Sequence, residues 1–227
     1  MKFKHLAAGL MVSGSMLLAG CGGGASALIT SDEEGNTKFD VVVLAETLAA
    51  YPIEVLSDQE QSSLLFMREE EKLAQDVYAN LAGVWGAQTN TFANISASEA
   101  THTEAVRELI ERYQLVDPAE GQPAGGFTDE GLQALYTQLV TTGAAGLTQA
   151  LQVGVEIEEL DIRDIALALV NVDNQDIRLV YDNLLKGSRN HLRSFYKSLL
   201  KAGGTYTPKY ISQDDFDAIV SSSMEQG

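Results

Sequence analysis

Glu99 and His102 are three residues apart, the spacing at which one helix can give a carboxylate and an imidazole to the same metal ion. They lie in residues 91–113, where apolar residues recur at helical intervals and place both side chains in the middle of the apolar face. Mixed oxygen and nitrogen ligands suit iron, manganese or zinc. The pair is a weak signal by itself, because acid-rich helices contain it by chance and an inward histidine is more often a hydrogen-bonded core residue.

Two later segments also carry polar residues on an apolar helical face. In residues 147–172, Glu158 and Asp161 fall at the centre of the apolar arc. In residues 174–202, the apolar face carries His191. Because acids and imidazoles from separate helices would then meet in one core, the set predicts a metal site more strongly than the single pair does.

The segment from residue 57 to 86 offers two adjacent acids, Glu70 and Glu71, and its apolar pattern leaves open which of them faces inward. No Lys or Arg lies on the central part of these inward faces. Since an unpaired buried carboxylate costs several kcal/mol, one or two divalent metal ions are the simplest neutralising partner. Iron is the first choice, with manganese or zinc as alternatives.

The elements that must position these residues are helices. Ser57 and Glu60 have the capping-box pattern, and Thr128 is expected to cap a shorter helix. Helices are expected over residues 57–86, 91–113, 128–143, 147–172, 174–202 and 213–222, whereas residues 39–56 are ambiguous. Two long helices before and two after a connection of about 30 residues predict an all-α, ferritin-like four-helix bundle with one long crossover connection and short extra helices.

The charge balance excludes some partners. Fifteen Lys and Arg against 32 Asp and Glu give a net charge of −17, which leaves no basic patch large enough to neutralise a run of phosphates. Nucleic acid and anionic lipid head groups are therefore poor partners. The acids outside the inward faces, Glu104, Glu108, Glu111, Glu156 and Glu159, are expected to form a solvated face.

The N-terminus has the pattern of a bacterial lipoprotein signal peptide over residues 1–20: a short basic start, an apolar stretch and Leu18-Ala19-Gly20 before Cys21. Cleavage would leave Cys21 to carry a lipid anchor, and no other cysteine for a disulfide or a thiolate metal site. We expect an exported, membrane-anchored protein that faces the periplasm, and Gly22 after the cysteine favours the outer over the inner membrane.

Three regions follow from these patterns. They are a signal peptide (1–20), a lipidated tether and N-terminal segment (21–56), and a helical bundle domain (57–222). Within the second region, residues 22–38 are Gly-rich, polar and without periodicity, which predicts a flexible tether.

Several long strings resemble the domain of unknown function 2202, a family placed among the ferritin-like proteins. They include LLFMREEEKLAQDVY, FANISASEATHTEAVRELIERY and DNQDIRLVYDNLLKGSRNHLRSF, and the resemblance covers about residues 56–213. It implies a ferritin-like bundle but no established activity. In the wider ferritin and rubrerythrin group, a first-helix Glu is followed by Ala three and Tyr seven positions later. Glu71, Ala74 and Tyr78 match this, which favours Glu71 over Glu70.

By the same resemblance, the expected metal ligands are Glu71, Glu99, His102, Glu158 and His191, with Asp161 as an addition. The chain departs from the ferritin-like pattern at Ser188, which stands where a bridging Glu would be, so a standard di-iron centre does not follow. Asp161 lies one helical turn beyond Glu158 on the same face. We hypothesise that it replaces the missing carboxylate in an asymmetric two-ion site.

Two classes of function remain open. The first is an envelope-anchored iron-dependent oxidoreductase or iron handler that reacts with a small-molecule oxidant. The second is a non-enzymatic helical-bundle lipoprotein, a binding module with a structural or vestigial metal site. The sequence assigns no catalytic residue, and it leaves open whether the bundles form a homo-oligomer.

Overall fold

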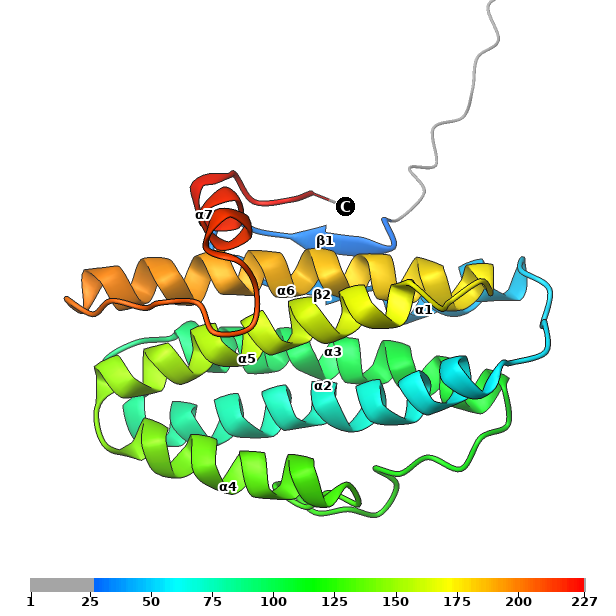
Figure 1. The fold of residues 1–227 in the computed structure, drawn as a ribbon, viewed down its shortest axis with the longest axis horizontal. Coiled ribbons are helices and arrows are strands. Elements are labelled where there is room, and N and C mark those ends of the chain that lie inside the picture. Colours follow the sequence, from blue (N-terminus) through cyan, green and yellow to red (C-terminus); the bar gives the residue numbers. More distant parts are fainter. Residues whose placement is uncertain (1–26, 227) are drawn as a thin grey trace, which may run out of the picture.

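Four long helices form a bundle in the computed structural model, which describes residues 27–226 (Figure 1). The elements in chain order are β1 (Ile29–Ser31), β2 (Thr37–Phe39), α1 (Val41–Ala49), α2 (Asp58–Trp85), α3 (Thr91–Arg112), α4 (Glu130–Ala144), α5 (Leu147–Leu169), α6 (Gln175–Lys201) and α7 (Gln213–Ser221). The predicted all-α class is confirmed, with a two-stranded sheet as the one addition in the described part of the chain.

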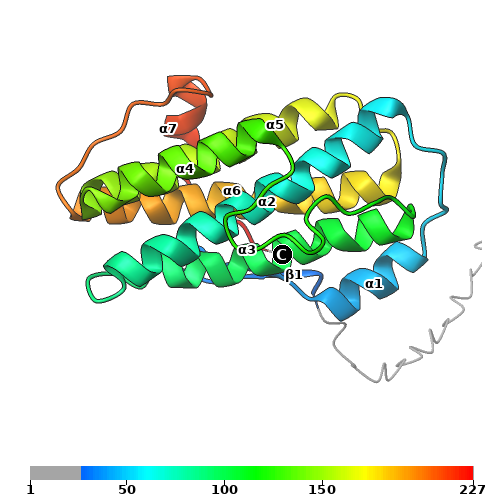
Figure 2. The same cartoon turned by 90° about the horizontal axis from the view of Figure 1, so that it is seen from below.

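The bundle is built from two helix pairs. Helix α2 packs along α3 and α5 packs along α6, while contacts of α2 with α5 and of α3 with α6 close the square. The long crossover between α3 and α5 contains α4, which lies against α2 and α5 (Figure 2). This is the connection predicted from the helix spacing.

The start of α2 follows from its sequence. The Ser57 hydroxyl accepts a hydrogen bond from the Glu60 N–H, and the Glu60 carboxylate accepts one from the Ser57 N–H, which completes the predicted capping box. The predicted cap of α4 is one residue off. Asp129 caps the helix, because the Thr128 N–H and hydroxyl both donate to Glu69 instead.

The apolar core has two layers. One contains Tyr78, Phe92 and Phe195, and the other contains Leu64, Leu109 and Tyr181. Along α2, α3 and α6, the polar residues singled out in the sequence fall between these layers. Each fully buried large apolar side chain stabilises the fold by about 1.5–3 kcal/mol, so the two layers can offset the cost of a polar layer between them.

The N-terminal segment differs from the prediction. Residues 29–39 form a hairpin in which Ile29 pairs with Phe39 and Ser31 with Thr37, so the expectation of a flexible tether over 22–38 is wrong for residues 29–38. Ile29 and Phe39 are buried, and Asp32 accepts hydrogen bonds from two backbone N–H groups in the turn. Turn bonds and the burial of two large side chains order a segment that composition alone marks as tether.

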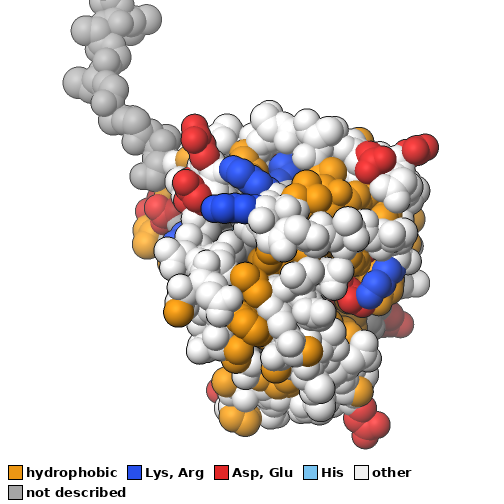
Figure 3. All heavy atoms as spheres, turned by 90° about the vertical axis from the view of Figure 1, so that its left-hand side faces the viewer, with side chains coloured by type: hydrophobic (Ala, Val, Ile, Leu, Met, Phe, Trp, Pro, Cys, Tyr) orange, Lys and Arg blue, Asp and Glu red, His pale blue; other side chains and the backbone are white. Residues whose placement is uncertain are grey.

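The predicted signal peptide and Cys21 lie outside the described residues. Within residues 27–226, no helix combines the length and the apolarity needed to cross a membrane. On the face shown in Figure 3, charged side chains cover only small areas between hydrophobic side chains and the white surface of other side chains and backbone.

Candidate metal centre

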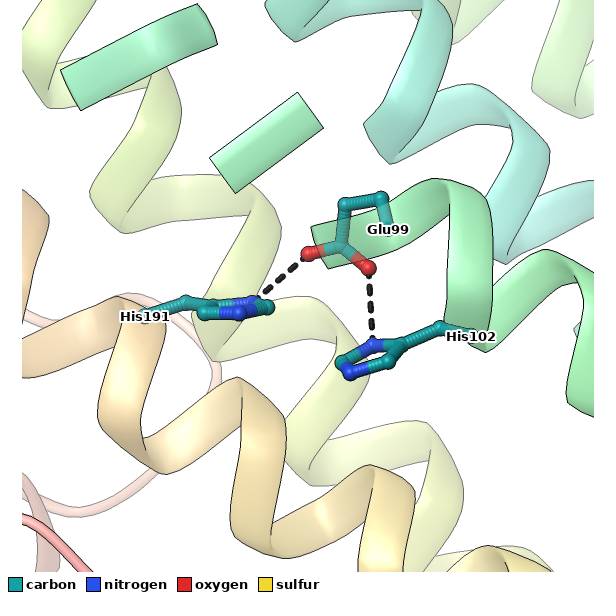
Figure 4. A group of neighbouring side chains, drawn as sticks. All are labelled: Glu99, His102 and His191. Atoms are coloured by element: carbon teal, nitrogen blue, oxygen red, sulfur yellow. Dashed lines mark ion pairs between the residues drawn. The ribbon is translucent and has the colours of Figure 1, made fainter. Parts of the chain in front are cut away.

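Glu99 and both histidines of the described chain meet in the middle of the bundle (Figure 4). Glu99 and His102 come from α3 and His191 comes from α6. The Glu99 carboxylate lies between the two rings, with Oε2 2.9 Å from His102 Nδ1 and Oε1 2.7 Å from His191 Nδ1. One ligand atom from each residue lies within 4.8 Å of the others, and all three side chains are buried. This group could hold a metal ion.

Two more predicted acids flank this group. Glu71 on α2 has Oε2 3.5 Å from His102 Nδ1, and Glu158 on α5 has Oε2 3.5 Å from His191 Nδ1. The Tyr78 hydroxyl donates a hydrogen bond of 2.6 Å to Glu158 Oε1 and so fixes that carboxylate. All four bundle helices therefore contribute to one buried polar layer.

Asp161 and Glu70 are also buried, at 1% and 4% exposure. Asp161 forms no ion pair with His102 or His191, so the structure places it in the bundle core without joining it to the histidine group. The sequence predicts that one of Glu70 and Glu71 faces inward, whereas both are buried. Glu71 is the one that reaches a histidine.

Beyond their ion pairs with the histidine Nδ1 atoms and the Tyr78 hydrogen bond to Glu158, the carboxylates of this layer lack hydrogen-bond partners within the protein. Both oxygens of Glu71 and of Glu99, one oxygen of Glu158 and one of Asp161 make no hydrogen bond, nor does Nδ1 of either histidine. Among the described residues, no Lys or Arg pairs with these four acids. Buried polar atoms in folded proteins are almost always hydrogen-bonded, so converging unpartnered oxygen and nitrogen atoms fit a metal ion.

The raised pKa values of Glu71, Glu158 and His191 also indicate an excess of negative charge in this layer. Burial raises the pKa of Glu71 and of Glu158 to about 7. Burial acts in the same direction on Glu99, but the adjacent His191 and His102 outweigh it and lower its pKa below the ordinary range. Burial disfavours charged His191, yet Glu99 and Glu158 raise its pKa to about 9. Without a metal ion, protons on Glu71, Glu158 and His191 offset part of the negative charge of this layer.

The outer nitrogens of the histidines have partners that the sequence analysis missed. His102 Nε2 lies 2.8 Å from the Thr37 carbonyl oxygen, and His191 Nε2 lies 2.9 Å from the Ser98 hydroxyl. Ser98 precedes His102 by four residues on the same helical face, which is a signal that could have identified it. Thr37 could not be identified this way, because the hairpin reaches the site through tertiary contacts.

Ser188 and Gly187 on α6 also lie near the centre. Ser188 is buried and donates to the Leu184 carbonyl of its own helix, so its hydroxyl does not replace the missing bridging acid. Gly187 lies against the His102 ring, where an added Cβ would stand 2.5 Å from the ring Cε1. Glycine at this position makes the space that the imidazole occupies.

Fold and site together define a helical bundle with a buried Glu/His/His group. Residues 60–223 match a family described as "Uncharacterized protein domain (DUF2202)", and the chain belongs to this family. It is 44% identical over 184 residues to the uncharacterised protein MJ0754 of Methanocaldococcus jannaschii, covering 81% of this chain and 98% of that protein. The crystal structure of hypothetical protein MJ0754 superposes with a TM-score of 0.75 over 78% of this chain and 99% of the other.

Proposed function

We propose that this protein is a ferritin-like metal protein of the bacterial envelope that binds iron and acts as an iron-dependent oxidoreductase or iron handler. The observation that carries the proposal is the buried layer of unpartnered carboxylate oxygens and imidazole nitrogens, to which all four bundle helices contribute. Such a layer is costly for a folded protein unless cations neutralise it.

The first ion would be held by Glu99, His102 and His191, with Nδ1 of both rings as the nitrogen ligands. Glu71 and Glu158 would complete its surroundings, since each has an oxygen 3.5 Å from one of those nitrogens. Iron, manganese and zinc all accept this mixture of ligands.

A second ion would draw on Asp161. Glu71, Glu99, Glu158 and Asp161 carry four negative charges when ionised, which two divalent cations would neutralise. Asp161 has one unpartnered oxygen, and burial followed by repulsion from Glu70 and Glu158 raises its pKa well above the ordinary range. This supports the hypothesis that Asp161 replaces the acid missing at Ser188.

Bound iron would supply electrons, one from each of two Fe²⁺ ions, to reduce one hydrogen peroxide to two hydroxide ions. The chain's own residues would hold the ions and exclude bulk water, since the six predicted ligands are no more than 1% exposed. Tyr78 would keep Glu158 oriented through its 2.6 Å hydrogen bond.

Fe²⁺ oxidation tests this function. Protein loaded anaerobically with Fe²⁺ and then mixed with peroxide should oxidise the iron at least about 10-fold faster than free Fe²⁺ in the same buffer. Glu104→Ala is the matched control, because Glu104 lies on α3 but pairs with Arg107 outside the centre. A rate equal to that of free Fe²⁺ would contradict the oxidoreductase proposal.

A structural ion in a non-enzymatic lipoprotein is the second candidate, and the full burial of the centre favours it, because structural metal sites are closed. In that case removing the metal should lower the melting temperature by several degrees, while peroxide leaves the metal-loaded protein unchanged. Slow oxidation together with strong thermal stabilisation by the metal would select this candidate.

The envelope location is proposed from the Leu18-Ala19-Gly20-Cys21 pattern. We expect the protein to be attached to the outer membrane by lipid on Cys21. Cys21→Ser should release the protein from membranes in cell fractionation. Membrane association equal to that of the wild type would contradict the anchor.

A further inference from the structure

The outer edge of β2 lies on one face of α3. The Thr37 N–H donates to Ser98 Oγ at 3.0 Å, and the Phe39 N–H donates to Thr101 Oγ1 at 3.0 Å. The Phe39 ring also meets the His102 ring edge-on, with centroids 5.7 Å apart. A strand edge that would otherwise need another strand is thus satisfied by hydroxyl groups next to the candidate metal centre.

The Thr37 carbonyl determines which nitrogen of His102 carries a proton. This oxygen accepts hydrogen bonds from the Ser98 hydroxyl and from His102 Nε2, the latter at 2.8 Å. A carbonyl can only accept, so His102 Nε2 must carry hydrogen. The Nδ1 atom of the same ring faces Glu99 and Glu71, where a metal ion would be held.

Ser98 extends the same constraint to His191. Its hydroxyl hydrogen is directed to the Thr37 carbonyl, so its oxygen is free to accept from His191 Nε2 at 2.9 Å. Both rings are then protonated at Nε2, and both present Nδ1 to Glu99. The two rings lie stacked, with centroids 5.1 Å apart.

We propose that the hairpin of residues 29–39 is the positioning element of the metal centre, and that it holds both histidines with Nδ1 toward the ion through the Thr37 carbonyl and the Ser98 hydroxyl. The proposal rests on the proposed metal-binding function. Partners of this kind on a ligating histidine fix its orientation and are worth 10- to 100-fold in metal affinity. The family match begins at residue 60, so the hairpin precedes the matched region.

Coupling must run in both directions. If the docked hairpin increases metal affinity, bound metal must stabilise the docked hairpin by the same factor. Loading the centre should therefore protect residues 29–39 from proteolysis. Lys38, which is exposed on β2, provides a trypsin site within the hairpin.

Contacts away from the ligands hold the hairpin and allow it to be disturbed separately. Gly35 has φ +89°, and an added Cβ would lie 2.7 Å from the Asn190 carbonyl oxygen and 2.9 Å from Ser194 Cβ. Asn190 Nδ2 donates to Thr37 Oγ1 at 2.8 Å. Gly35→Ala should displace the hairpin for both steric and conformational reasons without touching a proposed ligand.

The experiment compares Zn²⁺ affinity, measured by competition with a chelator, in the wild type, Ser98→Ala and Gly35→Ala. Both variants should bind Zn²⁺ about 10- to 100-fold more weakly. Lys38→Ala, on the exposed side of β2, is the control and should stay within about 2-fold of the wild type. Wild-type affinity in both variants would overturn the proposal while leaving the metal centre standing.

Two further readouts separate this proposal from the proposed function. Nitrogen-15 NMR of the histidine rings should show slowly exchanging Nε2–H groups in metal-free wild type, and faster exchange in Ser98→Ala. Trypsin should cut wild-type protein after Lys38 at least about 10-fold more slowly when Zn²⁺ is bound. A wild type that binds no metal would refute the proposed function. Zn²⁺ binding with unchanged cleavage at Lys38 and no protected Nε2–H would refute only the role of the hairpin.

Discussion

Two sets of buried carboxylates in this bundle have opposite surroundings. The metal-centre carboxylates are Glu71, Glu99, Glu158 and Asp161, and the anchoring carboxylates are Glu60, Glu69, Glu159 and Asp176. Every member of both sets is at most 3% exposed. The anchoring carboxylates are satisfied by hydrogen bonds from the protein, whereas the metal-centre carboxylates keep unpartnered oxygens. What distinguishes a candidate site from structural support is therefore not burial but the presence of oxygens that accept no hydrogen bond.

Glu158 and Glu159 show the contrast between sequence neighbours. Glu159 accepts hydrogen bonds from the Tyr206 hydroxyl and from the backbone N–H groups of residues 209–211, which attaches the segment after α6 to α5. Glu158 points into the bundle, where its partners are Tyr78 and the ring of His191. The expectation that Glu159 belongs to a solvated face is wrong, because the returning chain covers it.

The pKa values of one carboxylate from each set, Glu60 and Glu71, shift in opposite directions. Burial raises the pKa of Glu60, but hydrogen bonds from Ser57, Asn174 and Asp173 outweigh it, and the net pKa is lowered. Burial raises the pKa of Glu71 to about 7, and the nearby His102 does not cancel the effect. The fold thus stabilises the charge of Glu60 and leaves that of Glu71 to be compensated from outside.

The largest expected effect is the loss of metal when a ligand of the first ion is removed. Glu99→Ala and His102→Ala should each lower metal affinity at least about 100-fold, because each deletes a ligand atom from a site with few protein ligands. Isothermal titration with Zn²⁺ measures this. Glu104→Ala, five residues after Glu99 on α3 and paired with Arg107, should bind as the wild type does. Equal affinity in all three variants would refute the assignment.

The neighbouring pair on α5 should separate stability from metal binding. Glu159→Ala should lower the free energy of unfolding by about 3 kcal/mol, because it leaves several backbone N–H groups without an acceptor. Its metal affinity should be unchanged. Glu158→Ala should do the reverse, weakening metal binding while sparing the stability of the metal-free protein. Urea denaturation and Zn²⁺ titration of both variants check this. If the two variants change the free energy of unfolding and the Zn²⁺ affinity by the same amounts, the two sets of carboxylates do not differ in role.

Asp161 tests the number of ions. If it replaces the carboxylate missing at Ser188, Asp161→Asn should reduce the stoichiometry from about two ions to one or none. Ser188→Glu should be tolerated and bind metal at least as well as the wild type. Metal content per chain after gel filtration is the measurement. A wild type with one ion and no loss in Asp161→Asn would favour a mononuclear site.

The smallest effect concerns pH. The pKa values of Glu71 and Glu158, about 7 against an ordinary 4.5, and of His191, about 9 against 6.5, mean that the folded protein binds more protons than the unfolded chain between about pH 5 and 8. The metal-free protein should therefore lose stability as pH rises across this range, by about 1.4 kcal/mol per pH unit for each extra proton that the folded protein holds. Bound metal replaces these protons, so the loaded protein should not show this loss.

Urea denaturation of the metal-free and metal-loaded protein at several pH values measures this difference. A metal-free protein that gains stability as pH rises would contradict the raised pKa values of Glu71, Glu158 and His191.

Much of this architecture could be predicted because its signals are local. The helical period and the Ser57 capping box predicted α2, and the same period predicted that Glu99, His102 and His191 are buried. The direction in which a side chain points from a helix depends on its neighbours in the sequence, so one sequence is enough to predict which residues face inward.

The parts that were missed depend on long-range contacts. Thr37 reaches His102 across 65 positions, and Glu159 is covered by residues about 50 positions later. The pattern of an isolated helix predicts one inward face, and therefore one inward residue of Glu70 and Glu71. In the structure both are buried, because α2 is covered on several sides by α3, α4 and α5. Tertiary contacts of this kind are not encoded in the period of one helix.

The buried layer of carboxylates and histidines is proposed to be a metal site, and this can be tested directly. The most direct measurement is the metal content, by mass spectrometry of the elements, of wild-type protein purified without chelator and then incubated anaerobically with Fe²⁺ and desalted. If the layer is a metal site, wild-type protein should retain about one to two iron ions per chain, and Glu99→Ala less than about a tenth of that. Wild-type protein that retains no more iron than Glu99→Ala would contradict the proposal.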